Sequence, residues 1–342
     1  MLNLFCLNCN NQLSSDSSFC SNCGQKLKQK QLEIPIDTSN FLELARQGNT
    51  KWWTWTLGFI AILIGWQGIG FIPYLVACDA LTLDCGTYKN KGFLQVVEYL
   101  FSNWAFVVGI IAIFLVARIV HKRRITQMIT ARVSIDYDRM LYAMGVGLLI
   151  FTLSTILSLL IGETLEFNKP EFNVYISFVL LAIILTPVQA TMEEILFRGY
   201  ILQGLALRTK NIMLLCLING VLFMLPHLLN PEPYEYGFAQ YAVNMIIIGG
   251  FFTLLTIKDN GIEIPMGYHA IINLFIGLFI TTKTSVIHTP ALFTASRFEE
   301  TGLTGPWIIY EVILYALAYS IFSRKYKWNN DWIKDIRSRV SR

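Results

Sequence analysis

Ionisable side chains interrupt three apolar stretches in the second half of the chain. The segment "TMEEILFRGY" (191–200) contains Glu193, Glu194 and Arg198, and two later stretches contain one histidine each. A charged side chain costs a few kcal/mol or more at bilayer depth, so such groups are normally paired or functional. Carboxylate and imidazole groups can move protons to and from a reacting water molecule. These positions are therefore candidates for an acid–base site.

Helical spacing distinguishes the two adjacent glutamates. Glu194 and Arg198 are four residues apart, so they share a helix face and can form an ion pair. Glu193 and Arg198 are five residues apart, which is a poor spacing for such a pair. We therefore expect Glu193 to be the unpaired carboxylate that faces a cavity.

Residue counting places Glu193 opposite a histidine. "LRTKN" (207–211) predicts the turn between the helix that carries Glu193 and the next helix. Glu193 lies sixteen residues before Thr209, and His227 lies eighteen residues after it. An antiparallel hairpin brings these two side chains to nearly the same height. Phe223 lies one turn before His227 and is expected to wall the same pocket.

A second histidine continues the pattern on a third helix. "HAIIN" places His269 and Asn273 four residues apart, on one helix face. Three prolines lie close to these groups, where they would bend helices and help to open a polar cavity: Pro187, Pro226 and Pro265. Together the patterns E-E-x-x-x-R, F-x-x-x-H and H-x-x-x-N favour a functional site over charges that only hold helices together.

The amino terminus contains a separate motif. "CLNC" and "CSNC" supply four thiols in two C-x-x-C pairs, Cys6, Cys9, Cys20 and Cys23, which match the ligand set of tetrahedral zinc. A pair of disulfides is the alternative, but so short a module has too little core to fold without a metal. We assign 1–26 to a zinc ribbon and 27–50 to a linker. Three lysines without aromatic residues are weak support for nucleic-acid binding, so we favour a protein partner or a structural role for the ribbon.

The rest of the chain is typical of a polytopic membrane protein. Of the 342 residues, 54% are hydrophobic and 15% are charged, and the mean hydropathy is +0.50, whereas soluble domains carry about 25% charged residues. Eight apolar runs are long enough to cross a bilayer, near 52–77, 95–120, 138–162, 173–197, 211–229, 238–257, 262–281 and 304–323. We therefore predict an all-α membrane protein with about eight transmembrane helices, preceded by the zinc ribbon.

The distribution of basic residues predicts the orientation in the membrane. "HKRR" (121–124) follows the second run and the carboxy-terminal tail is basic, whereas loops 162–172 and 230–237 contain one lysine between them. The positive-inside rule then places both termini in the cytoplasm. The lipid bilayer is an expected partner of the apolar helices. Cys78 and Cys85 would lie outside, as a disulfide or as two thiols.

Three motifs resemble the signatures of a known family. "EEILFR" (193–198), "FMLPH" (223–227) and "HAIIN" (269–273) are similar to those of the CPBP (CAAX protease and Abi) intramembrane proteases. That family includes type II CAAX prenyl proteases and bacteriocin-immunity-related bacterial members, so a bacterial cytoplasmic membrane is expected. The resemblance covers 138–323, and 51–137 would then add two transmembrane helices with a basic loop, and 324–342 a basic tail.

The resemblance implies catalytic roles for six residues: Glu193, Glu194, Arg198, His227, His269 and Asn273. Glu193 and His227 would activate a water, and His269 with Asn273 would bind the oxyanion, while the remaining two hold the helix and tune the local field. The substrate would be a membrane-associated or lipidated protein. A catalytic zinc on Glu193, His227 and His269 and a metal-free glutamate mechanism both stay open, because H-E-x-x-H is absent.

Two other functions are compatible with the same residues. A non-catalytic membrane scaffold, or a bacteriocin-immunity-type factor, would bind peptides in the polar cavity. A transporter is the weakest alternative, because Glu311 is the only other deeply placed charge that the pattern shows and no inverted repeat is found.

Overall fold

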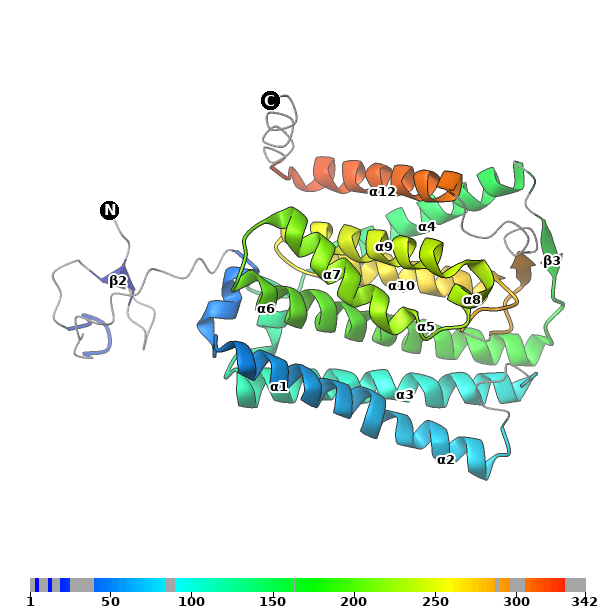
Figure 1. Ribbon diagram of the computed structural model, residues 1–342, viewed down its shortest axis with the longest axis horizontal. Helices are drawn as coiled ribbons and strands as arrows, with labels where there is room; N and C mark the ends of the chain where they lie inside the picture. Colours follow the sequence, from blue (N-terminus) through cyan, green and yellow to red (C-terminus); the bar gives the residue numbers. More distant parts are fainter. Residues whose placement is uncertain are drawn as a thin grey trace.

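The computed structural model describes residues 4–5, 12–13, 19–24, 40–83, 90–160, 162, 164–286, 289–295 and 305–329. Most of these residues are helical, and the long helices run side by side in one bundle (Figure 1). The predicted all-α architecture is confirmed.

The first half of the chain contributes three long helical segments. These are α1 (Trp52–Leu63) with η3 (Ile64–Gly68), η4 (Ile69–Phe71) and α2 (Ile72–Ala80), then α3 (Phe93–Leu115) with η5 (Val116–Val120), and finally α4 (Tyr137–Leu160). The basic loop before α4 contains the short helix η6 (Ile125–Met128).

The second half supplies the helices that carry the candidate site. They are α5 (Phe172–Glu194) with η7 (Ile195–Ile201) and α6 (Leu202–Ala206), α7 (Ile212–His227), α8 (Glu232–Tyr236), α9 (Phe238–Asp259), α10 (Glu263–Leu278) and α12 (Gly305–Tyr326). The turn expected at 207–211 connects α6 to α7.

All eight predicted apolar runs are helical, but the count of eight membrane spans is not confirmed. Within the described part of the chain, five helical segments are long and apolar enough to cross a membrane: Trp52–Ala80, Phe93–Val120, Tyr137–Leu160, Phe172–Ala206 and Phe238–Asp259. α7 and α10 have 16 residues each, a length of ~24 Å, which is shorter than a bilayer core.

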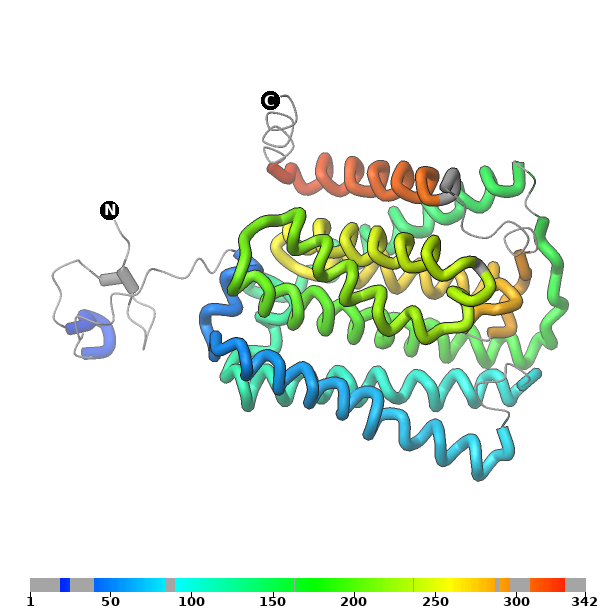
Figure 2. Tube along the Cα trace, in the orientation of Figure 1, coloured from blue at the N-terminus to red at the C-terminus, as the bar shows by residue number. Residues whose placement is uncertain are grey.

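The helices pack in an order that differs from their order in the sequence. α10 lies between α4 and α5 and also contacts α9, α3 packs against the other side of α5, and α1 and α2 cover α3. α12 covers α4 and α9 at the opposite edge (Figure 2). The two helices that carry most of the candidate residues, α5 and α10, are therefore central.

One end of the bundle carries a small sheet and is called the sheet end below. β3 (Leu165–Phe167) pairs antiparallel with β5 (Phe293–Ala295), and β5 pairs in parallel with β4 (Ile280–Thr281). α8 lies at the same end (Figure 1). These segments close the space beyond the ends of α4, α5 and α10.

The opposite end, the basic end, holds the basic loop 121–136 and residues 40–50. Phe41 and Ala45 are fully buried, and the short helix η2 (Glu43–Gln47) contacts α6. Gln203 donates from its side-chain amide to the carbonyl oxygen of Phe41 at 3.1 Å. The last part of the predicted linker 27–50 is therefore packed on the helical body.

Little of the ribbon lies within the described residues. β1 (Leu4–Phe5) pairs antiparallel with β2 (Gln12–Leu13). Cys20 and Cys23 flank a tight turn that is closed by a hydrogen bond from the Gly24 amide to the Cys20 carbonyl at 2.9 Å. Cys6 and Cys9 lie outside the described residues. In the last turn of α2, Cys78 is disulfide-bonded, and Cys85 is outside the described residues.

Candidate active site

The helix that carries the two glutamates changes its winding directly after them. α5 ends at Glu194, and the π-helix η7 extends from Ile195 to Ile201. Short π-helical segments are rare and occur often at functional sites. The side-chain amide of Asn219 on α7 donates to the carbonyl oxygen of Phe197 in this turn at 2.9 Å. A neighbouring helix thus satisfies a backbone group of the widened turn.

Glu194 is the centre of a buried polar group. Its Oε1 atom accepts a hydrogen bond from Arg198 Nη1 at 3.0 Å and lies 2.8 Å from His269 Nδ1. The ion pair predicted from the four-residue spacing is confirmed, and both of its side chains are fully buried. A carboxylate accepts only, so His269 Nδ1 carries the proton and donates it. This bond leaves His269 Nε2 facing the cavity.

Arg198 is held on three sides. Its Nη2 atom donates to the carbonyl oxygen of Gly249 at 3.1 Å, and its guanidinium carbon lies 4.4 Å from the centroid of the Phe223 ring. α7 and α9 approach each other closely here. A Cβ atom added at Gly249 would lie only 2.8 Å from the Cα atom of Gly220. Small residues allow this contact between helices in a membrane, and it brings the Gly249 carbonyl within reach of the guanidinium.

His269 links the buried group to Glu193. His269 Nε2 lies 3.2 Å from Asn273 Nδ2 and 3.9 Å from Glu193 Oε2. Glu193 also accepts a long hydrogen bond of 3.4 Å from Gln189 Nε2, one turn earlier on α5. Among the described residues, His269 is the only cation-forming side chain within 4.0 Å of the Glu193 carboxylate. Glu193 therefore remains without the arginine partner that Glu194 has.

His227 lies at the carboxy-terminal end of α7. Its Nδ1 atom is 2.8 Å from the carbonyl oxygen of Phe223. A carbonyl oxygen only accepts, so Nδ1 donates and Nε2 is left for the cavity. The rings of Phe223 and His227 are stacked at a tilt, with centroids 4.5 Å apart. Phe223 therefore positions His227 through both its backbone and its ring.

One cavity of about 620 Å³ brings the candidates together. Its walls include Glu193, His227, His269 and Asn273, from α5, α7 and α10. Glu194 and Arg198 do not line it and lie behind His269 and Phe223. The structure thus brings four of the six candidate residues to one space and places the other two as their support.

The comparisons identify the family. The model for type II CAAX prenyl endopeptidase Rce1-like proteins matches residues 175–275, which contain all six candidates. The chain is 30% identical over 261 residues to the uncharacterized protein YyaK of Bacillus subtilis (strain 168), which covers 73% of this chain and 86% of that protein. The chain belongs to the Rce1-like family. A zinc-ribbon domain matches residues 5–27, and no solved structure matches the chain.

Membership in the Rce1-like family supports intramembrane endopeptidase activity in general. Together with the apolar helices, it identifies an integral membrane protein. The Rce1-like match is shorter than the 138–323 expected from the motifs, and α4 and α12 lie outside it.

The cavity of this Rce1-like protein is also lined by polar residues that lie outside the three sequence motifs. Gln189, Asn244 and Glu98 line it as well. Gln189 could have been found from its position four residues before Glu193. Glu98 accepts hydrogen bonds from Tyr74 at 3.1 Å and Asn90 at 2.7 Å.

The described residues of the cavity do not fit a catalytic zinc. A three-ligand site needs three His, Cys, Asp or Glu side chains converging on one point, and no such group occurs among the described residues. His269 Nε2 is instead within hydrogen-bond distance of Asn273. The thiols of the ribbon suit zinc by their chemistry, and two of the four expected ligands, Cys6 and Cys9, lie outside the described residues.

Proposed function

We propose that this protein is an endopeptidase that hydrolyses peptide bonds of membrane-associated or lipidated polypeptides in the cavity between α5, α7 and α10. The observation that supports it most is the common cavity of Glu193, His227, His269 and Asn273, which are contributed by three helices. These groups include a carboxylate without an arginine partner, two imidazoles and an amide. Such a set can activate water and stabilise an oxyanion.

In the proposed reaction, Glu193 takes a proton from a water molecule that His227 orients through Nε2. The water oxygen forms a bond to the peptide carbonyl carbon, and the carbonyl oxygen becomes negatively charged. The C–N bond then breaks, and the proton held by Glu193 passes to the leaving nitrogen. No step of this proposed reaction requires a metal ion.

His269 and Asn273 are proposed to donate hydrogen bonds to the oxyanion. Asn273 Nδ2 and His269 Nε2 are 3.2 Å apart, so both can reach one oxygen atom. His269 can donate from Nε2 only when both ring nitrogens are protonated. The Glu194 carboxylate at 2.8 Å from Nδ1 stabilises that positive ring. Glu194 is thus a positioning residue, because it acts through His269.

The cavity walls suggest where a polypeptide enters. Beyond the candidate residues, the lining includes Tyr74, Glu98, Asn230 and Val286, which lie toward the sheet end. The positive-inside rule places the basic end in the cytoplasm. We therefore propose that the substrate reaches the cavity from the sheet end, on the non-cytoplasmic side.

The test is identification of the cleavage products. Full-length protein in lipid nanodiscs is incubated with membrane-anchored reporter peptides, and the products are analysed by mass spectrometry. We expect one defined cleavage in the wild type and none in His227→Ala. Equal cleavage by wild type and His227→Ala contradicts this mechanism. Peptide binding without cleavage, in wild-type protein that retains its fold, supports the scaffold function instead.

A further inference from the structure

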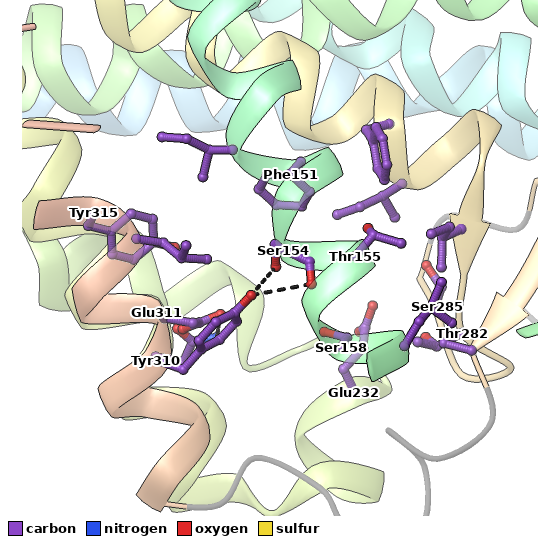
Figure 3. A pocket seen from close by; sticks show the side chains of 18 of the residues that line it. Phe151, Ser154, Thr155, Ser158, Glu232, Thr282, Ser285, Tyr310, Glu311 and Tyr315 are labelled. Carbon is purple, nitrogen blue, oxygen red and sulfur yellow. Dashed lines mark hydrogen bonds between the residues drawn. The ribbon is translucent and has the colours of Figure 1, made fainter. Parts of the chain in front are cut away.

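A second chamber adjoins the catalytic cavity at the sheet end. It has a volume of about 340 Å³ and lies between α4, α10 and α12 (Figure 3). Phe151, Asn244, Glu311 and Tyr315 line both the chamber and the catalytic cavity. The two spaces therefore adjoin each other along these side chains.

The chamber wall is rich in hydrogen-bond acceptors. Glu311 on α12 and Glu232 on α8 face it from different sides (Figure 3). Hydroxyl groups line the space between them, among them Ser154, whose Oγ accepts a hydrogen bond of 2.9 Å from the Tyr310 hydroxyl. None of the described residues that line the chamber is a lysine, arginine or histidine. The described lining thus contains two carboxyl groups and no basic side chain.

Buried polar atoms in the wall lack a partner within the described structure. Asn244 is 6% exposed and Tyr268 is fully buried, and both line the chamber. The Asn244 Oδ1 atom, the Tyr268 hydroxyl and the Glu232 Oε2 atom make no hydrogen bond to a described residue. Leaving such groups unsatisfied costs about 1–3 kcal/mol each. A ligand with several donors would remove this cost.

The unsatisfied acceptors and the carboxyl groups specify the ligand's chemistry. Asn244 donates its amide at 3.5 Å to Glu311 Oε1, so its carbonyl oxygen points elsewhere and adds to the acceptors. An ammonium or guanidinium group carries three to five donors and one positive charge. An anion would meet two carboxylates, and an apolar group would leave the acceptors unsatisfied.

We propose that the chamber is a substrate subsite that takes a lysine or arginine side chain of the polypeptide held in the catalytic cavity. This inference rests on the proposed function for the identity of that polypeptide as a substrate. It adds a charge requirement: substrates carry a basic residue near the cleaved bond.

The test measures binding separately from hydrolysis. Full-length Glu193→Gln protein in nanodiscs is titrated with fluorescent peptides that differ only by lysine or norleucine at one position, with every position scanned. We expect a position at which lysine binds about tenfold or more tightly, since hydrogen bonds to charged groups contribute about 1.5–3 kcal/mol. The proposal is overturned if the lysine and norleucine peptides bind with equal affinity at every position, or if neither peptide binds measurably.

Variants of the wall provide the control. Glu311→Gln and Glu232→Gln, each added to the Glu193→Gln protein, should reduce the lysine preference at that position. Glu171→Gln, an exposed glutamate at the start of α5 that does not line the chamber, should leave it unchanged. A lysine preference that persists in both wall variants overturns the proposal. Two variants are used so that the test does not depend on a single variant that fails to fold.

Hydrolysis assays separate this proposal from the proposed function. Selective binding of the lysine peptide by a protein that cleaves nothing would contradict the proposed hydrolysis but keep the subsite. Cleavage of lysine and norleucine peptides with equal kcat/KM and equal affinity would contradict the subsite alone.

Discussion

His269 and Glu194 form a buried hydrogen bond in which Nδ1 lies 2.8 Å from Oε1. The same carboxylate oxygen accepts from Arg198 at 3.0 Å. In Glu194→Gln the ring loses its charged partner but keeps a possible acceptor, so His269 is less able to carry a positive charge. We expect kcat to fall by about 10-fold to 100-fold, the range given for carboxylates that support metal-bound histidines, with little change in KM. A change confined to KM would contradict this role of Glu194.

Removal of Arg198 tests how much its ion pair with Glu194 contributes to the free energy of unfolding. Arg198→Met leaves the fully buried Glu194 without its cation, and the expected loss is about 3–5 kcal/mol of unfolding free energy. Arg46→Met is the matched control, because Arg46 pairs with Glu43 at 2.6 Å but is 42% exposed, and it should lose about 0–1 kcal/mol. Denaturation in detergent micelles compares the two, and equal losses would contradict the account.

Local spacing explains what could be predicted from the sequence. The pair of Glu194 and Arg198 depends on one helix, and residue counting across one hairpin placed Glu193 and His227 near the same height. The hydrogen bond from His269 to Glu194 joins residues 75 positions apart. No local pattern indicates it, because the packing of α10 against α5 decides which oxygen the ring meets.

Other features depend on packing in the same way. The π-helix after Glu194 has no signature in "ILFRGYI". Phe41 is fully buried at the basic end. Its burial could not be predicted, because the segment around it is polar and follows the zinc ribbon. The side chamber combines Ser154, Glu232 and Glu311 from separate elements, and each of them alone resembles an isolated polar residue.

The pH dependence of peptide selection follows from Glu232. Burial raises the pKa of this carboxyl group above its ordinary value, although the Val286 amide, which donates at 2.8 Å, opposes the shift. As the pH falls, Glu232 gains its proton earlier than an exposed glutamate, while a lysine ligand stays charged. As the pH is lowered, the preference for lysine over norleucine should therefore weaken before it reaches about 4.3, the ordinary pKa of glutamate.

Glu232→Gln provides the control for this pH dependence. Among the described lining residues, Glu311 is the other carboxyl group of the chamber. Tyr241 on α9 interacts electrostatically with Glu232. The variant should show a weaker and flatter preference over the same pH range. An identical pH profile in wild type and variant would show that Glu232 does not select the peptide.

Zinc content separates the ribbon from the cavity. Purified protein should hold about one zinc ion per chain, bound by the four ribbon thiols. Cys20→Ser should lose it, whereas Glu193→Gln and His227→Ala should keep it, as measured by elemental analysis. Cys20→Ser should still hydrolyse peptides. A second zinc ion that disappears in His227→Ala would contradict the metal-free cavity.

The most direct test of the central claim is the turnover of one membrane-anchored peptide by wild type, Glu193→Gln and Glu171→Gln in parallel. Loss of a general base costs about 10²–10⁴-fold in rate, so Glu193→Gln should be slower by at least about 100-fold while it binds the peptide with unchanged affinity. Glu171→Gln should match the wild type. Turnover by Glu193→Gln at the wild-type rate would contradict the assignment of Glu193 as the base that activates water.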